Sequence, residues 1–555
     1  MVLISSFFGR SPGRAARVLA LSVATIVLMG ACAPTAPAPA KPAQSSGAGA
    51  PSAEPGVPTS PVAAGGVTGA NAPAAPPDKQ VLRLITANMP RSLDPVNIDA
   101  QRIIENGLAE PVVRQRLDGS IAPGLAQSWK LIEPTVWEIE LPANATFWSG
   151  AKADAAAVKA SLERHAKLNP RAKSVLEKVE YQVVDPTHLR FKLAAPDPAF
   201  LFKIVTLGIH NAAQADAIGD KFNSEPDLTG YFKPTQFVAG EVMIAEAWPG
   251  YWGEKPKLQR LEARLGSDAQ ARELALKTNA ADMDINVDVD QRKRYEDAKG
   301  FTFYPTNPGT RNIWLNIKNV PALQDKNVRQ ALSLALDRKE MQQGVFRGYA
   351  GLPTGHFPAG LPYAITTGPQ TDLQKANQLL DESGWKPGSD GIRAKDGQRL
   401  NFRVLTYSYL EATAIAAQDY WKKIGVGTDL HVVEITSSNQ IMYDGNFDIA
   451  TYCSCGAATG DVAGQLRAYY SSNVVSNFGR YSNPEVDTLI DRASTEFDEA
   501  KRFALAKQIQ EIVADDVPIV YVANIEAFST IYSSRVQGVN ADRARDVTPS
   551  TYIAQ

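Results

Sequence analysis

The residues best placed for covalent catalysis are Ser149 and Lys152, which form an S-x-x-K pair. In acyl-enzymes with this motif the lysine helps to activate the serine, and S-D-N and K-T-G motifs complete the site. Neither partner motif occurs here, since Lys277 and Thr278 are followed by asparagine. The chain also lacks a P-loop, an HExxH motif and a GxGxxG motif opening a helix, and its G-x-S-x-G stretch at 9–13 precedes the folded body. The sequence therefore predicts that the protein is not an enzyme.

Metal binding is the second chemistry that the residue types allow. Cys453 and Cys455 stand two residues apart, so their sulfur atoms could share a soft metal or form a strained disulfide. Two donors do not complete a zinc site, and buried free thiols are the alternative. The histidines are scattered without an H-x-H or H-x-x-x-H spacing: His165, His188, His210, His356 and His431. We therefore expect neither a metal nor another cofactor.

The overall composition limits the classes of partner. The chain has 555 residues, which is more than one hydrophobic core usually organises, so we expect two or more lobes. Lys and Arg number 57 against 59 Asp and Glu. Binding to nucleic acid or to an anionic membrane surface needs clustered positive charge, and this balance does not provide it. We expect no nucleic-acid partner.

The N-terminus indicates export. Three arginines precede an apolar stretch at 18–29, and Gly30, Ala31 and Cys32 follow it. This is the pattern of a secretory signal, and its ending resembles a lipobox, in which cleavage leaves the cysteine to carry lipid. We expect a signal peptide at 1–31, lipidation of Cys32 and an Ala/Pro-rich disordered tether at 32–80. The protein would then be extracytoplasmic and lipid-anchored to the cell membrane, on the periplasmic side in a Gram-negative host.

The body that follows reads as a mixture of strands and helices. Strand-like runs occur at 81–86, 136–141, 401–405, 430–435 and 517–522, and helical periodicity occurs at 373–381, 415–424, 486–493 and 503–513. Asp185 and the following Pro186 mark a turn between two further strand-like runs. Asp154 and Asp325 are expected N-caps. Strands interleaved with helices along the chain predict α/β lobes.

Several ordered segments of the body resemble a known family. They include the P-G-L-A-Q-S-W stretch at 123–129, the F-W-S-G stretch with its following helix at 145–162, Y-W-G-E-K-P at 251–256, D-K-N-V-R-Q-A-L at 325–332 and Y-S-N-P-E-V-D at 481–487. Together they resemble the bacterial extracellular solute-binding proteins of family five, which supply peptides, nickel chelates and related solutes to ABC importers.

The resemblance implies a two-lobed α/β fold of the periplasmic-binding-protein type, with a ligand cleft at the hinge. Lobe I would comprise 81–307 and 519–555, and lobe II would comprise 308–518. A monomer would capture a peptide or peptide-like small molecule by hinge closure and pass it to the permease subunits of an importer. The alternative is a lipid-anchored envelope sensor or cell-wall interaction protein of the same fold.

The resemblance also points to the recognition loop of the cleft. Peptide receptors of this family hold the α-ammonium group of the peptide with an aspartate in the loop after an F-D strand. Phe447 and Asp448 match that pair, but Ala457 occupies the aspartate position and Asp461 follows further along. Either the amine contact is missing, or Asp461 takes it over after a shift of the loop.

Three arginines are available for a solute of opposite charge. Arg102 and Arg171 fall in segments that line the cleft in relatives, and Arg311 lies beside the expected hinge. Guanidinium groups bind carboxylates in a bidentate geometry, so we expect a carboxylate or other anion, including a modified peptide. The alternative is that these arginines are solvated or paired on the surface.

The remaining cleft residues bear on aromatic contacts and on nickel. Trp314 and Tyr452 are candidates for the cleft walls, with a core position as the alternative. Nickel-chelate receptors of the family use aromatics and a histidine in the segment that corresponds to 447–473. Here Cys455 stands where a tryptophan is expected, and the segment contains no histidine. We therefore predict no dependence on nickel.

Overall fold

The computed structural model describes residues 72–555, except 98–99, 117–118, 297, 456–459, 541–542 and 544. Cys32, Ala457, the predicted signal peptide and most of the predicted tether lie outside the described residues.

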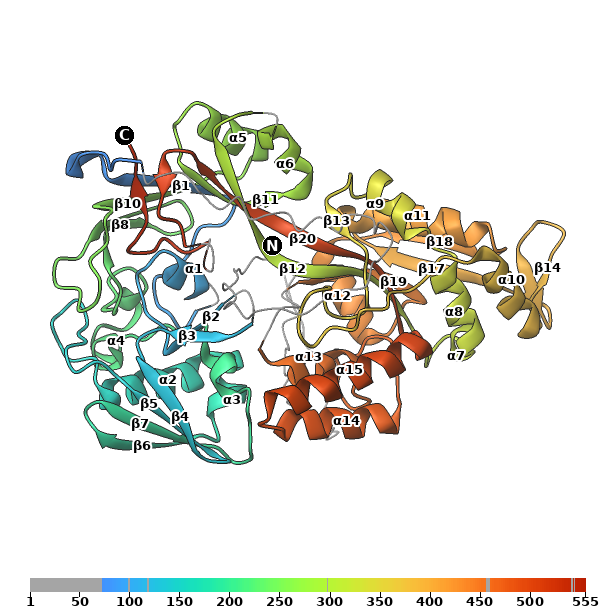
Figure 1. The fold of residues 1–555 in the computed structure, drawn as a ribbon, viewed down its shortest axis with the longest axis horizontal. Coiled ribbons are helices and arrows are strands. Elements are labelled where there is room, and N and C mark those ends of the chain that lie inside the picture. Colours follow the sequence, from blue (N-terminus) through green and yellow to red (C-terminus); the bar gives the residue numbers. More distant parts are fainter. Residues whose placement is uncertain are drawn as a thin grey trace, which may run out of the picture.

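Two long strands run through the centre of the molecule. β12 (Phe301–Leu315) and β20 (Ile519–Ser533) pair antiparallel along most of their length, from Phe301 opposite Ser533 to Trp314 opposite Ile519. Figure 1 shows them passing from one half of the molecule to the other. Because each strand contributes to both halves, the halves are joined by a crossing of paired backbone rather than by a free linker.

The other strands of this eleven-stranded sheet extend on either side of that pair. They are β19 (Ile449–Cys455), β17 (Asn401–Thr406) and β18 (Gly427–Val432) beyond β12, β11 (Met283–Asp288), β1 (Val81–Thr86), β10 (Arg260–Leu265), β9 (Val242–Ala247) and β8 (Phe232–Val238) beyond β20, and β13 (Ala350–Gly351), which pairs with β20 outside this order.

One half, which we call lobe II, packs helices on both faces of the sheet. Side chains alternate along β12, so Ile313 and Leu315 enter one core and Trp314 enters the core on the opposite face. The helices are α7 (Pro321–Gln324), α8 (Lys326–Leu334), α9 (Arg338–Gly344), α10 (Leu373–Glu382), α11 (Glu411–Lys422), α12 (Ile435–Asp444), α13 (Val462–Tyr470), α14 (Pro484–Thr495) and α15 (Glu499–Asp516). A small sheet of β14 (Lys386–Pro387), β15 (Arg393–Lys395) and β16 (Gln398–Arg399) is also part of this lobe.

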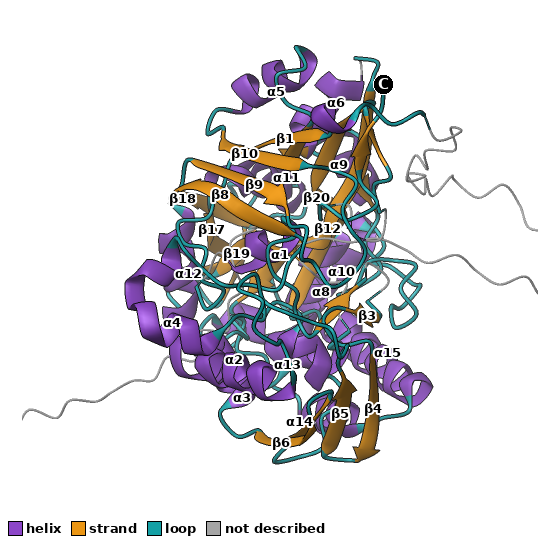
Figure 2. Cartoon of the chain, turned by 90° about the vertical axis from the view of Figure 1, so that its left-hand side faces the viewer, coloured by secondary structure: helices purple, strands orange, loops and turns teal. Residues whose placement is uncertain are grey.

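The other half, lobe I, contains the N-terminal part of the sheet and a separate four-stranded sheet, ordered β4 (Ser128–Glu133), β5 (Val136–Glu140), β7 (His188–Lys192) and β6 (Glu180–Asp185). Figure 2 shows α2 and α3 beside this smaller sheet, whose inner face shares a core with them. The lobe I helices are α1 (Ala100–Glu105), α2 (Ala155–Leu168), α3 (Pro170–Leu176), α4 (Ala212–Ile218), α5 (Ala269–Lys277) and α6 (Val289–Glu296). Short strands pair as β2 (Val113–Gln115) with β3 (Ile121–Pro123) and β21 (Val536–Gln537) with β22 (Tyr552–Ile553), and 3-10 turns occur at Pro77–Lys79, Phe200–Ile204, Gly219–Asn223 and Ser408–Leu410.

Local sequence signals account for many of these boundaries. Asp154 caps α2 by accepting a hydrogen bond from the Ala157 nitrogen at 3.0 Å, and Asp325 caps α8 through the Asn327 nitrogen at 2.9 Å. The turn at Asp185 joins β6 to β7, and the Asp185 carboxylate accepts from the Thr187 nitrogen at 2.7 Å. The predicted α/β class, both caps and this hairpin are confirmed.

The predicted tether is too long at its C-terminal end. Residues 72–80 are folded, and Gln80 is buried between the two ends of the described chain. Its Nε2 donates to the Ala75 carbonyl at 2.8 Å and to the Ile553 carbonyl at 2.9 Å, and its Oε1 accepts from the Ile553 nitrogen at 2.9 Å. Composition missed this segment because its partners are supplied by the opposite end of the chain.

The second expected boundary, at 519, also needs correction. Val520 and Val522 of β20 belong to a core of lobe II, whereas Ile531 and Tyr532 of the same strand pack in lobe I. The chain therefore returns to lobe I within β20. The crossing occurs inside one strand that contains neither glycine nor proline, so no turn signal marks it in the sequence.

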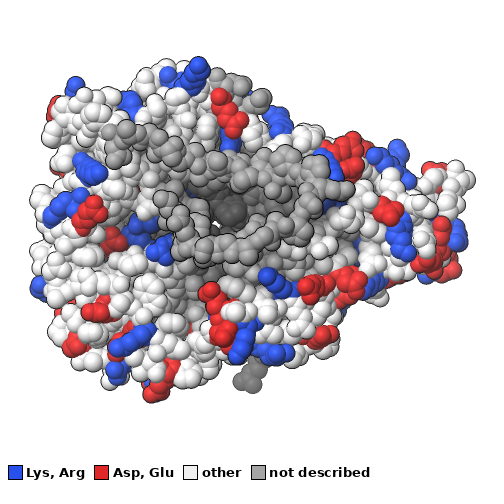
Figure 3. All heavy atoms as spheres, in the orientation of Figure 1, with Lys and Arg blue, Asp and Glu red and all other residues white. Residues whose placement is uncertain are grey.

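The described surface has mixed charge. On the face shown in Figure 3, basic and acidic residues are interspersed among uncharged ones. No helix within the described ranges combines the length and the apolar character needed to cross a membrane.

Candidate functional site

The candidate site is a pocket of about 360 Å³ between the two lobes. Lobe I lines it with α3 and the segment 193–203, and lobe II lines it with residues 460–464, the C-terminal end of α14 and Arg502 of α15. Figure 1 shows α3 next to α13 and α14 at this boundary. Since both lobes form its walls, the shape of the pocket depends on how closely the lobes approach each other.

Among the predicted site residues that the structure describes, Asp461 alone lines this pocket. Its carboxylate accepts a hydrogen bond from the Gly464 nitrogen at 2.9 Å and so caps α13. Burial raises the pKa of Asp461, and the positive charge of Lys203 from the opposite lobe partly offsets that effect. Asp461 is thus a structural cap whose carboxylate also faces the pocket.

Three other charged side chains around the pocket have partners on their own lobes. Lys203 pairs with Asp197 at 2.7 Å, and Arg467 pairs with Asp491 at 2.7 Å. The Nη1 atom of Arg502 donates to the Glu496 carbonyl at 2.8 Å. A charged solute group would compete with these contacts. The sequence does not predict these residues as a site, because they come from loops and helix ends without a distinctive spacing.

Arg311 forms a second cluster where the lobe II strands end. It lies opposite Cys453 in the β12–β19 pairing, and its guanidinium carbon is 4.2 Å from the ring centre of Tyr409. The residue is 6% exposed, no carboxylate among the described residues pairs with it, and its Nη1 has no hydrogen-bond partner there. A buried guanidinium without a carboxylate partner is costly, so this arrangement favours an anionic group nearby.

The carboxyl ends of parallel strands are the usual ligand side of an α/β sheet. β17 and β19 run parallel, and Tyr409 follows the end of β17. Cys453 lies near the end of β19, where it is buried and forms no disulfide with a described residue, and burial raises the pKa of its thiol. Cys455 forms the last position of β19, and Ala457 lies outside the described residues, so their roles remain predictions.

Trp314 and Tyr452 occupy the aromatic core of lobe II. Trp314 is 1% exposed, and its ring stacks on Tyr469 with 5.4 Å between centroids. Tyr452 is 4% exposed and contacts Trp314 edge to face at 6.5 Å. In this structure both are core residues, the alternative that the sequence left open.

The structure does not bring Arg102 and Arg171 to the pocket. Arg102 is buried in lobe I, where its Nη1 donates to Glu105 at 2.7 Å. Arg171 is exposed on α3 and is not among the residues that line the pocket. Arg102 is thus paired in the interior of lobe I, and not on the surface as the alternative expected.

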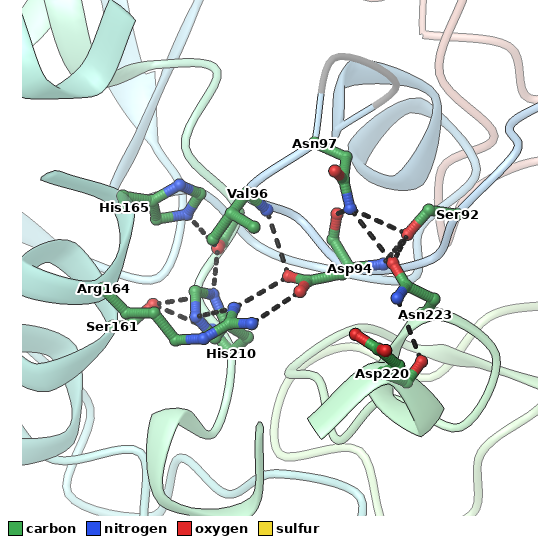
Figure 4. Close-up of polar contacts among 11 residues, drawn as sticks. Ser92, Asp94, Val96, Asn97, Ser161, Arg164, His165, His210, Asp220 and Asn223 are labelled. Carbon is green, nitrogen blue, oxygen red and sulfur yellow. Dashed lines mark hydrogen bonds and ion pairs between the residues drawn. The ribbon is translucent and has the colours of Figure 1, made fainter. Parts of the chain in front are cut away.

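A cluster in lobe I resembles a hydrolytic site at first sight (Figure 4). The Nδ1 atom of His210 lies 3.0 Å from the Ser161 hydroxyl, and its Nε2 lies 3.1 Å from Nη1 of Arg164. Because a guanidinium can only donate, Nε2 must accept and Nδ1 carries the proton. Protonated Nδ1 cannot take the proton of Ser161, so the cluster is structural. Arg164 is itself held by Asp94 at 2.6 Å.

Metal binding finds no support in the described residues. They contain no group of three or more His, Cys, Asp or Glu side chains that could hold a metal ion. The buried histidines have other contacts: His165 Nε2 lies 3.0 Å from the Gly208 carbonyl, and His356 Nδ1 lies 3.1 Å from the Tyr470 hydroxyl.

Two lobes joined by crossing strands, with a pocket between them, define a ligand-binding protein of the periplasmic-binding type. The model of the family "bacterial extracellular solute-binding proteins, family 5 middle" matches residues 120–477, and the chain belongs to this family. Proteins of this family are extracytoplasmic binding proteins of transport systems and not enzymes.

Individual relatives bind different solutes. The chain is 30% identical over 360 residues to the oligopeptide-binding protein OppA of Lactococcus lactis, covering 59% of this chain and 58% of that protein. It is 26% identical to the nickel-binding periplasmic protein of Escherichia coli, covering 81% of this chain and 90% of the relative. The match to another curated relative likewise spans only 59% of its length. A solved nickel ABC transporter structure from Bacillus halodurans superposes with a TM-score of 0.73 at 26% identity, covering 86% of this chain and all of the other.

Proposed function

We propose that this protein is the extracytoplasmic solute receptor of an ABC importer, which captures a peptide or peptide-like solute by closure of its two lobes. The proposal rests on a pocket whose walls come from both lobes, in a molecule whose lobes are joined by the β12–β20 pair. A solute that contacts both walls stabilises the closed form, which permease subunits can distinguish from the open form. The receptor acts as a monomer and requires no cofactor.

We further propose that the solute carries an anionic group. Arg311 supports this, because it is buried, stacked on Tyr409 and without a carboxylate partner among the described residues. A carboxylate of the solute would supply that partner through charge-assisted hydrogen bonds. Arg171, exposed on α3, remains a candidate for an outer contact.

Native mass spectrometry of protein purified from its own host tests the proposed function. We expect a co-purified small molecule that is released on denaturation. Calorimetric titration then compares unblocked peptides with N-acetylated peptides and amine-free acids. Binding of the blocked acids that is lost in Arg311→Ala and retained in Arg171→Ala supports the anion at Arg311. Tight binding of unblocked peptides that is abolished by Asp461→Ala would contradict the anion at Arg311 and indicate an ordinary peptide receptor.

Anchoring by Cys32 is part of the same proposal, because a receptor must stay near its permease. Its support is the apolar run before Cys32 and the composition of the segment after it. Metabolic labelling with a fatty-acid probe should mark the wild type and not Cys32→Ser. Equal labelling of both would contradict lipidation at this residue.

A further inference from the structure

Phe202 of lobe I and Gly460 of lobe II meet across the lobe boundary. The Phe202 ring lies directly over the Cα atom of Gly460, so that a Cβ at this position would come closer than 3.0 Å to three ring atoms. Real Cβ atoms almost never approach other atoms so closely. Glycine therefore permits an interlobe contact that any other residue would block with the ring in its present position.

The backbone conformation does not explain the glycine. Gly460 is not among the glycines with a positive φ, so an L side chain is compatible with its backbone. What excludes a side chain is the aromatic ring from the opposite lobe. The requirement for glycine at this position thus arises from the approach of the lobes.

Each partner is fixed to the core of its own lobe. Phe202 lies in the 3-10 turn Phe200–Ile204, whose residues Leu201 and Ile204 are buried in the lobe I core. Gly460 immediately precedes the capped helix α13, and Val462 is buried in the lobe II core. The Phe202 side chain itself is half-buried, and buried neighbours hold the backbone of each partner, so the contact depends on the distance between the lobes.

We propose that Phe202 and Gly460 form a closure contact that sets how far the two lobes approach each other around the pocket. The contact deepens the proposed function, on which its role in solute capture rests. With alanine at position 460, the methyl group would strike the Phe202 ring before the lobes reach their present spacing. We expect the closed population to fall roughly tenfold, the usual scale for overpacking one methyl group against a fixed neighbour. Phe202→Ala removes the obstacle together with the apolar contact, so it should weaken closure less than Gly460→Ala does.

Distances between spin labels test the closure contact in the full chain. Lys173 on α3 and Arg492 on α14 are exposed, and cysteines at these positions can carry nitroxide labels in a Cys32→Ser/Cys455→Ser background. Double electron–electron resonance then compares the wild type with Gly460→Ala, Phe202→Ala and the double variant. Spectra are recorded with and without a tryptic digest of casein as the peptide probe. Gly344→Ala is the matched control, because Gly344 has no atom within 4 Å of an added Cβ and no positive φ.

We expect Gly460→Ala to shift the distribution toward longer distances, the double variant to return it to that of Phe202→Ala, and Gly344→Ala to match the wild type. Wild-type distances in Gly460→Ala would overturn the closure contact. If Gly460→Ala does not fold, Phe202→Ala decides, and wild-type distances in that variant would likewise overturn it. If the digest leaves the short-distance population of the wild type unchanged, this result counts against peptide capture. The comparison of the variants still tests the contact.

Discussion

The carboxylate of Asp461 lies over the Cα atom of Gly464, whose backbone nitrogen donates to it at 2.9 Å. A Cβ at position 464 would come closer than 3.0 Å to that carboxylate. The cap of α13 therefore requires both residues, one for its oxygen and the other for its lack of a side chain. Because α13 begins at the pocket, the cap also fixes the lobe II wall.

The first prediction concerns this cap. Asp461→Ala should lower the free energy of unfolding by about 1 kcal/mol, since the N-terminal amides of α13 lose their acceptor. Asp498→Ala removes the corresponding cap of α15, where the carboxylate accepts from the Lys501 nitrogen at 2.9 Å, and serves as the control. Urea unfolding measures both. If the two variants lose equal stability and Asp461→Ala keeps its solute affinity, Asp461 has a purely structural role. If Asp461→Ala loses no stability, the cap is contradicted.

The second prediction concerns acid stability. Burial lowers the pKa of His165 to about 4, below its ordinary value of 6.5. Between these values the unfolded chain binds a proton that the folded protein excludes, so stability is complete above pH 6.5 and falls as the pH drops. From pH 7.5 to pH 5 this histidine should cost about 2 kcal/mol. In His165→Gln the difference in unfolding free energy between these pH values should shrink by that amount, and an unchanged difference would refute the assignment.

The third prediction concerns the buried ion pairs of lobe I. Glu105 lies between Arg102 at 2.7 Å and the fully buried Arg545 at 3.4 Å. Glu105→Gln leaves two buried guanidinium groups without their carboxylate, so we expect a loss on the order of 3–5 kcal/mol. Glu163→Gln breaks an exposed pair with Lys159 and should change stability by less than about 0.5 kcal/mol. Similar small changes in both variants would show that the buried cluster contributes little.

The fourth prediction concerns nickel. The buried Cys453 thiol has a raised pKa because of its burial, which disfavours the thiolate that a metal would require. We expect elemental analysis of protein purified without added metal to find no stoichiometric nickel. Bound nickel that disappears in Cys453→Ser/Cys455→Ser would contradict this and restore the paired-cysteine site.

Local sequence signals predict many of the helices and helix caps. The helices predicted at 373–381 and 486–493 appear as α10 and α14, because their apolar residues recur at the helical period on one buried face. The caps at Asp154 and Asp325 are equally local, since each carboxylate bonds an amide within three residues of itself. Such features depend only on neighbouring residues, and one sequence suffices to find them.

The sequence by itself determined the α/β class, the absence of catalytic motifs and, through its ordered motifs, the family. Only the tertiary structure decided that Trp314 is enclosed by Tyr469, that Arg102 is paired with Glu105, and that the ring of Phe202 lies against Gly460. Phe202 and Gly460 belong to different lobes, and nothing in the residues around either one encodes the other. Their contact arises from the packing of each lobe on its own core and from the crossing of β12 and β20, which brings the lobes together.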